Sequence, residues 1–157
     1  YKPNSNQLDK VTDDYPTVNN MGDFTEGPNG TGTDYDYDAN GNLTIDQNKK
    51  ISGINYNYLN LIQNISVTGK GTIEYQYDAA GNKLSKKVTE GSTVKTTLYV
   101  GGAVYENDVL QFIAHEEGRV RWVPLPGGGG GGSLHYDYFI KDHLGNTRVV
   151  LTEEQQT

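Results

Sequence analysis

Apolar and polar residues alternate along most of the chain, and this period of two predicts β-strands. In residues 73–78, Ile73, Tyr75 and Tyr77 alternate with polar residues, which places apolar groups on one face of a strand and polar groups on the other. Leu84 and Val88 then return at even spacing, which places Lys83, Ser85 and Lys87 on the opposite face. The two runs together predict one β-hairpin.

The residues between these runs have the composition of a tight turn. Asp78 can accept a hydrogen bond from the backbone N–H two residues further on, and Gly81 tolerates a positive φ angle. Residues 35–43 repeat the pattern, with Asp38 and Gly41 in the same places. The chain therefore contains an internal repeat of this hairpin.

Three further stretches predict hairpins with altered turns. Residues 51–67 alternate like a strand pair but lack the aspartate and glycine of the turn, which indicates a partner hairpin between two full copies. Residues 104–110 predict a hairpin with its tip at residues 107–108. Residues 112–120 keep the spacing of the repeat, with Gly118 in the expected turn position.

The last hairpin is predicted over residues 136–150. Its turn contains Asp142, His143 and Gly145, and an aliphatic strand returns after it. We expect His143 to form a hydrogen bond within this turn. We also expect Arg148 to pair with Asp142 across the turn; an exposed pair of this kind contributes about 0.2–1 kcal/mol.

These elements predict an all-β fold, an antiparallel meander of hairpins that forms a curved sheet or part of a β-shell. Residues 1–33 are interpreted as a degenerate first repeat with loops, and residues 34–126 as the repeat sheet. Residues 127–133 are six glycines and a serine, a composition typical of a flexible linker, natural or engineered. Residues 134–157 are predicted to contain the final hairpin.

Tyrosine carries most of the aromatic packing, with 12 copies against 3 phenylalanines and 1 tryptophan. Because the rings recur at equivalent places in each hairpin, we expect cross-strand ladders, which contribute about 0.2–1 kcal/mol per pair. Alternatively, exposed rings stack on sugars while Asp and Asn bind the sugar hydroxyls, which predicts an adhesion or carbohydrate-binding module. The predicted ladder positions are Tyr35, Tyr37, Tyr56, Tyr58, Tyr75, Tyr77, Tyr136 and Tyr138.

The chain is acidic, with a formal charge of −7. Nucleic acids and anionic membranes are repelled by this charge, so neither is an expected partner. The absence of cysteine excludes disulfides and thiolate chemistry. No apolar run approaches the roughly 18 residues that a membrane-spanning helix needs, so no membrane insertion is expected.

One stretch resembles the opening of a calcium loop. Asp36, Asp38 and Asn40 have the right spacing, and a glycine follows them. However, Gln47 occupies the twelfth position, where such loops have a bidentate glutamate, and no helices are predicted on either side. The pattern therefore favours a hairpin turn stabilised by Asp38 over a metal site.

No other residues have the spacing of a catalytic or cofactor site. His115, His135 and His143 lack the spacing of a metal-binding or acid–base motif, and no serine lies in a nucleophile-elbow string. The sequence predicts neither an enzyme nor a bound cofactor.

The repeated string resembles the YD-repeat family, also called RHS repeats, whose unit is Tyr-x-Tyr-Asp-x-x-Gly followed by a polar and an aliphatic residue. Residues 35–43 match this unit, and residues 75–84 match it with Lys83 inserted before the leucine. Residues 138–148 resemble the Asp-His-Leu-Gly-x-x-Arg signature near the start of the RHS-associated core region. Together these strings look like the large surface or secreted RHS proteins of Bacteroidetes.

The resemblance implies a structural role, for a protein that is secreted or lies on the bacterial cell surface. In this family the repeats coil a β-sheet into a hollow shell, which encloses a C-terminal toxin in polymorphic toxin systems and forms a surface barrel in teneurins. The implied partners are the rest of such a shell and a C-terminal cargo, and an open sheet edge also predicts edge-to-edge homo-oligomers. None of the five prolines follows an aspartate, so we expect no Asp-Pro self-cleavage segment of the kind that ends many family shells.

Overall fold

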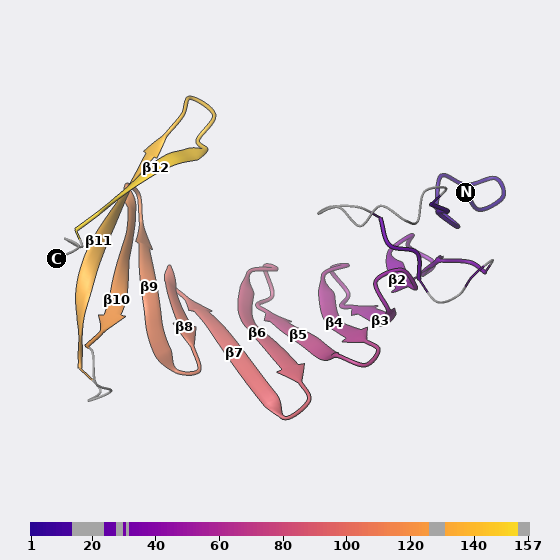
Figure 1. The fold of residues 1–157 in the computed structure, drawn as a ribbon, viewed down its shortest axis with the longest axis horizontal. Helices are drawn as coiled ribbons and strands as arrows, with labels where there is room; N and C mark the ends of the chain where they lie inside the picture. Colours follow the sequence, from indigo (N-terminus) through magenta and orange to yellow (C-terminus); the bar gives the residue numbers. More distant parts are fainter. Residues whose placement is uncertain (14–23, 28–29, 31, 126–130, 154–157) are drawn as a thin grey trace. The chain divides into compact units, whose positions relative to one another are not determined.

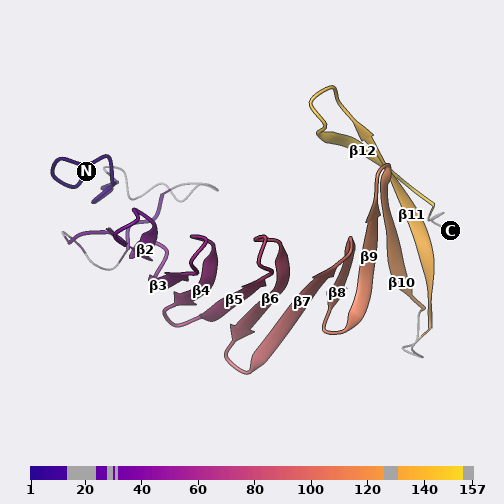
Figure 2. The same ribbon diagram turned by 180° about the vertical axis from the view of Figure 1, so that it is seen from behind.

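The computed structural model describes residues 1–13, 24–27, 30, 32–125 and 131–153. Within these residues the chain forms twelve β-strands and no helix (Figures 1 and 2). The strands follow one another in the sheet in the order of the sequence, as an antiparallel meander. The predicted all-β antiparallel meander is therefore confirmed.

The bounds of the twelve strands follow in chain order. They are β1 (Tyr35–Tyr37), β2 (Leu43–Asp46), β3 (Ile51–Tyr56), β4 (Ile62–Val67), β5 (Gly71–Tyr77), β6 (Lys83–Glu90), β7 (Thr93–Val100), β8 (Ala103–Glu106), β9 (Val109–His115), β10 (Gly118–Pro124), β11 (Gly132–Lys141) and β12 (Thr147–Thr152).

The chain divides into two compact units. Unit 1 comprises Tyr1–Asn82 and Lys86–Val94, so it contains β1 to β5 and the tip of the β6–β7 hairpin. Unit 2 comprises Lys83–Ser85 and Lys95–Thr157, so it contains β8 to β12 and the remainder of that hairpin.

Each unit buries little apolar surface. Among the described residues, Ile54 on β3 is the one buried apolar side chain, at 7% exposure. The side chains most completely shielded from solvent are acidic: Asp34 is 0% exposed and Asp137 is 1% exposed. Since a buried carboxylate needs hydrogen-bond partners, polar contacts take a large part in holding these hairpins together.

The β8–β9 hairpin confirms the turn predicted at residues 107–108. Glu106 pairs with Val109 across the tip, and Asn107 and Asp108 have φ angles of 47° and 66°. Positive φ at both central residues gives the turn the twist that two-residue hairpin loops favour.

Gly118 does not lie in a turn of the predicted kind. It is the first residue of β10, and it pairs with His115 across a loop of residues 116–117. Its φ angle is +157°, and a Cβ atom there would overlap the carbonyl oxygen of Asp137 on β11. Glycine is required because two strands approach closely at this point, not because the chain reverses there.

Gly71 has the same role in unit 1. It begins β5 with a φ angle of +153°, and a Cβ atom there would overlap the carbonyl oxygen of Thr89 on β6. The sheet therefore uses glycine twice where a strand begins beside a neighbouring backbone.

The predicted linker at residues 127–133 is partly strand. Residues 127–130 lie outside the described residues, whereas Gly132 and Ser133 begin β11 and pair with Pro124 and Val123 of β10.

Candidate functional site

Asp38 organises the turn between β1 and β2 by accepting hydrogen bonds from the backbone. Its Oδ1 accepts the N–H of Asn40 at 2.9 Å and the N–H of Asn42 at 2.8 Å. The side chain of Asn42 also donates to Asp38 Oδ2 at 3.0 Å. The Asp38 N–H donates to the Asn42 carbonyl at 2.9 Å, which closes the turn. Asp38 therefore forms an Asx turn.

The same arrangement recurs after β5 and after β11. Asp78 Oδ1 accepts the N–H groups of Ala80 and Asn82, at 2.9 and 2.8 Å. Asp142 Oδ1 accepts the corresponding groups of Leu144 and Asn146, at 2.9 and 3.0 Å.

A fourth Asx turn follows β3, at a place where the sequence shows neither the aspartate nor the glycine. Asn57 Oδ1 accepts the N–H groups of Leu59 and Leu61 at 2.9 and 3.0 Å, and Asn60 has a φ angle of 57°. Asn57 and Asn60 thus replace the aspartate and the glycine. Residues 51–67 are a copy of the repeat rather than a different partner hairpin.

Glycine at the fourth position of the other three turns supplies the left-handed backbone. Gly41, Gly81 and Gly145 have φ angles of +84°, +87° and +83°. Asparagine tolerates positive φ better than other side chains, which explains how Asn60 can take this position.

Hydrogen bonds to the turn carboxylates favour their ionised form. The Asn42 side chain is the main cause of the lowered pKa of Asp38, and the Asn82 side chain has this role for Asp78. For Asp142, partial burial opposes the shift, but the N–H of Asn146 and the Arg148 side chain outweigh it, so this pKa is also lowered.

Tyrosine hydroxyls connect successive hairpins of unit 1. The residue before each Asx turn is a tyrosine, and its hydroxyl donates to a backbone carbonyl of the preceding hairpin. Tyr56 donates to the Leu43 carbonyl at 2.7 Å, and Tyr77 donates to the Ile62 carbonyl at 2.9 Å. Partial burial raises the pKa of both hydroxyls.

Tyr37 makes the same contact with the N-terminal segment, where its hydroxyl donates to the Leu8 carbonyl at 3.1 Å. This segment is closed by a hydrogen bond from the Lys2 N–H to the Gln7 carbonyl, although it forms no strand.

Lysine takes the place of tyrosine before the last Asx turn. Lys141 Nζ donates to the Glu116 carbonyl in the loop of the preceding hairpin, at 3.2 Å. A long side chain with a terminal donor is thus the shared requirement at this position.

Two pairs of tyrosine rings make contact along a strand: Tyr75 with Tyr77 at 6.3 Å and Tyr136 with Tyr138 at 6.0 Å between centroids. The cross-strand tyrosine ladder stays a prediction. Tyr58 lies in the Asn57 turn and is 82% exposed. The hydroxyl of Tyr35 accepts a hydrogen bond from Asn48.

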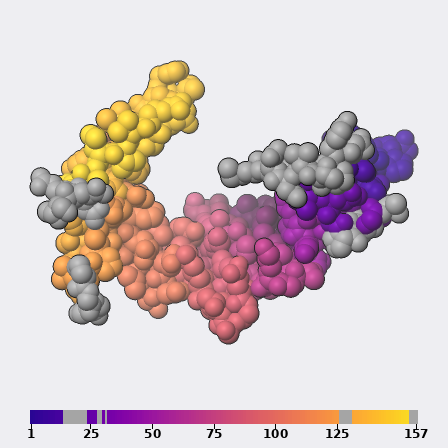
Figure 3. All heavy atoms as spheres, viewed as in Figure 1, coloured from indigo at the N-terminus to yellow at the C-terminus, as the bar shows by residue number. Residues whose placement is uncertain are grey.

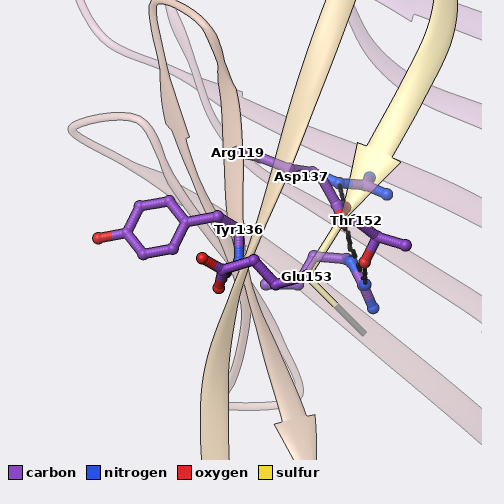
Figure 4. Close-up of polar contacts among 6 residues, drawn as sticks. Arg119, Tyr136, Asp137, Thr152 and Glu153 are labelled. Atoms are coloured by element: carbon purple, nitrogen blue, oxygen red, sulfur yellow. Dashed lines mark hydrogen bonds and ion pairs between the residues drawn. The ribbon is translucent and has the colours of Figure 1, made fainter. Parts of the chain in front are cut away.

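Asp137 forms a buried ionic cluster that the sequence did not predict (Figure 4). Arg119 Nε donates to Asp137 Oδ2 at 2.8 Å, and Arg121 donates to both Asp137 oxygens at 2.6 and 3.1 Å. Arg121 also reaches Thr152 Oγ1 on β12 at 3.1 Å. These bonds, mainly those from Arg121, lower the pKa of Asp137 to about 2. The cluster therefore joins β10, β11 and β12.

Glu153 extends this attachment just past the end of β12 (Figure 4). Its N–H donates to the Tyr136 carbonyl at 3.0 Å, and its Oε2 accepts the Tyr136 N–H at 3.1 Å.

An aromatic group lies on the opposite face of unit 2. The rings of Tyr136 and Tyr138 are nearly parallel, with an interplanar angle of 12°. The His115 ring meets both edge-on, at 6.1 and 6.2 Å. Gly118 on β10 pairs with His115 of β9 on one side and with Tyr138 of β11 on the other. Since glycine has no side chain, no β10 side chain separates these two rings. Tyr136 and Tyr138 are 42% and 44% exposed.

The residues of the calcium-loop string have other partners. Asp36 pairs with Lys2 at 3.0 Å, Asp38 binds its own turn, and the Asn40 side chain donates to Asn60 of the next Asx turn at 3.0 Å. Within the described ranges, no three His, Asp or Glu side chains gather as a metal site would require.

The last turn is held by its aspartate. Arg148 reaches Asp142 at 2.7 Å across the turn. The His143 ring makes no hydrogen bond with any residue that the structure describes, so it does not fix the turn in the way we expected. His135 is bonded to Ser133 at 2.7 Å.

No family model matches the chain, and a comparison with curated protein sequences finds no match. Across the ranges that the structure covers, no helix has the length and hydropathy needed to cross a membrane.

Proposed function

We propose that the chain is a non-enzymatic structural scaffold, a section of a YD- or RHS-type repeat wall that encloses or presents a C-terminal cargo such as a toxin. The observation that carries this proposal is how the repeated residues are used. The aspartates bind their own turns, and the tyrosine hydroxyls of unit 1 bind the preceding hairpin. Residues used in this way hold the sheet together, so few side chains of the motif are left for catalysis or ligand binding.

Protection of a cargo tests this proposal. The segment that follows Thr157 in the native reading frame is expressed behind this chain and, separately, alone, and both proteins are digested with the same protease. We expect the fused cargo to be cleaved at least ten times more slowly. A matched fusion with Gly71→Ala disturbs the β5–β6 contact and should restore cleavage. Equal cleavage of fused and separate cargo would contradict the scaffold function.

A second candidate is a glycan-binding or adhesion module, favoured by the exposed rings of Tyr136 and Tyr138 beside His115. Exposed aromatic rings can stack on sugar rings, and neither tyrosine hydroxyl is bonded to another described residue. A glycan array separates the two functions. Binding that is lost in Tyr136→Ala with an unchanged melting temperature supports the adhesion module. An array on which no glycan is bound would exclude it.

A further inference from the structure

In the first Asx turn, between β1 and β2, an asparagine directly precedes the glycine. The corresponding residues of the other three Asx turns are Leu59, Ala80 and Leu144, so among these turns Asn40 alone brings a side-chain amide to this position. Asn40 and Gly41 are both exposed, and the violet atoms of this part of the chain lie at the surface in Figure 3. Because glycine has no Cβ atom, its backbone nitrogen is an unhindered nucleophile toward the amide of the residue before it.

Two hydrogen bonds of the folded turn involve the atoms that such a reaction changes. Asn40 Nδ2 donates to Asn60 Oδ1 in the next Asx turn at 3.0 Å, and the Gly41 N–H donates to the Asp38 carbonyl at 3.1 Å. The reaction removes the proton from the Gly41 nitrogen and releases the Asn40 side-chain nitrogen, so both bonds must break. Each bond stabilises the unreacted turn and therefore slows the reaction.

We propose that Asn40 is a site of spontaneous deamidation, and that the Asn60 side chain in the adjacent turn slows this modification. The Gly41 nitrogen attacks Asn40 Cγ, its proton passes through water to Nδ2, and Nδ2 leaves as ammonia. The cyclic succinimide that forms then takes up one water molecule, and its ring opens to aspartate or isoaspartate at position 40. Water is the only co-reactant, and nothing is oxidised or reduced.

The product disturbs the turn and its contact with the next hairpin. A carboxylate at position 40 has no hydrogen to donate to Asn60 Oδ1, and it adds a negative charge close to Asp38. Isoaspartate also lengthens the backbone inside the turn, which the Asp38 N–H and the Asn42 carbonyl close at 2.9 Å. The bond from Asn42 Nδ2 to Asn60 Oδ1, at 3.0 Å, would then be left to join the two turns through their side chains. Deamidation is therefore expected to loosen the contact between the first two hairpins.

Peptide mapping of the whole chain after incubation in mildly alkaline buffer tests the proposal. Mass spectrometry follows conversion at Asn40, and fragmentation separates it from the other Asn-Gly pair, at residues 29–30. The same chain unfolded in guanidinium chloride shows the rate without the folded contacts. We expect conversion in the folded chain that is faster than at Asn82, which precedes Lys83, and slower than at Asn40 in the unfolded chain. No conversion at Asn40 in the folded chain, or equal rates in the folded and unfolded chains, would overturn the proposal.

Two substitutions at position 60 test the restraint. Asn60→Gly suits the positive φ angle of 57° but removes the acceptor, so Asn40 should convert about 2- to 10-fold faster, the factor that one hydrogen bond contributes. Asn60→Asp keeps an acceptor oxygen and tolerates positive φ, so the rate should stay close to that of the unmodified chain. Equal rates in Asn60→Gly and the unmodified chain would overturn the role of Asn60.

Hydrogen exchange of the Asn42 amide, which donates to Asp38 Oδ1, shows whether the turn stays closed. Exchange in Asn60→Gly should match the unmodified chain; faster exchange would assign the faster deamidation to a loosened turn and overturn the role of the Asn60 oxygen. In the deamidated chain, separated by ion exchange, this amide should exchange faster, and equal exchange would contradict the structural consequence.

Asn40→Ala is the matched control, because alanine has the corresponding place in the Asp78 turn. It should abolish modification at position 40 and leave the melting temperature unchanged. Isoaspartate that still forms between residues 36 and 46 of this variant would overturn the assignment to Asn40. The reaction does not depend on the scaffold function, so its failure would leave that proposal intact.

Discussion

At the scale of single residues, aspartate and asparagine can serve the same turn, since the backbone needs only one oxygen as acceptor. Asp78→Asn should therefore change the free energy of unfolding by less than about 0.5 kcal/mol, as the natural Asn57 turn indicates. Asp78→Ala removes the acceptor and should lower it by about 1–2 kcal/mol. Urea unfolding at pH 7 measures both. An Asp78→Asn variant that folds normally but loses a binding activity would show that this turn is a site.

The fourth turn position tests the backbone requirement. Gly81 has a φ angle of +87°, and a Cβ atom there would lie 3.2 Å from Leu61 Cδ1. Gly81→Val should lower the free energy of unfolding by about 2–3 kcal/mol because a β-branched residue is strained at positive φ. Gly81→Asn should cost less than about 1 kcal/mol, as Asn60 adopts this conformation. Equal effects of the two substitutions in urea unfolding would count against the equivalence of the two turns.

At the scale of elements, a side chain added where two strands approach closely should disturb the sheet more than one added at a turn position with positive φ. Gly71→Ala places a methyl group on the Thr89 carbonyl oxygen, whereas Gly69→Ala, in the same β4–β5 turn, meets nothing within 4 Å. We expect Gly71→Ala to separate β5 from β6 and Gly69→Ala to cost only about 1 kcal/mol from positive φ. Hydrogen exchange of the β5 amides compares the two; equal protection would contradict the close approach.

The attachment of β12 should weaken in acid. The pKa of Asp137 is about 2 in the folded chain against an ordinary value of 3.8. The ionised carboxylate therefore contributes stability that is present above about pH 4 and is lost as the pH falls toward 2. Hydrogen exchange of the β11 and β12 amides should accelerate as the pH falls over this range. In Asp137→Asn the same amides should exchange fast already at pH 6. An Asp137→Asn variant that keeps wild-type protection at pH 6 would exclude this role.

The sequence allowed the meander and three of the four Asx turns to be predicted, because alternation and the Asp-to-Gly string are local signals. The Asn57 turn was missed since asparagine replaces both marker residues. The Asp137 cluster was missed because it depends on which β11 residue faces Arg119 and Arg121, and that register is not local. Faces were also misjudged: Leu84 is 45% exposed and Ser85 is buried, and a one-residue change of register exchanges faces.

At the scale of the whole molecule, both units rely on polar contacts between hairpins because the sheet has so little apolar core. In unit 1 the tyrosine hydroxyls before the Asx turns provide these contacts. In unit 2 the Asp137 cluster provides them near β12.

The most direct test is equilibrium urea unfolding of a triple variant, Tyr37→Phe, Tyr56→Phe and Tyr77→Phe. Each substitution removes one hydroxyl that joins two hairpins, so we predict a loss of about 2–4 kcal/mol in the free energy of unfolding. The matched control, Tyr136→Phe with Tyr138→Phe, should change it by less than about 0.5 kcal/mol, since neither hydroxyl is bonded within the described residues. A triple variant as stable as the unmodified chain would contradict the structural role of the repeated tyrosines.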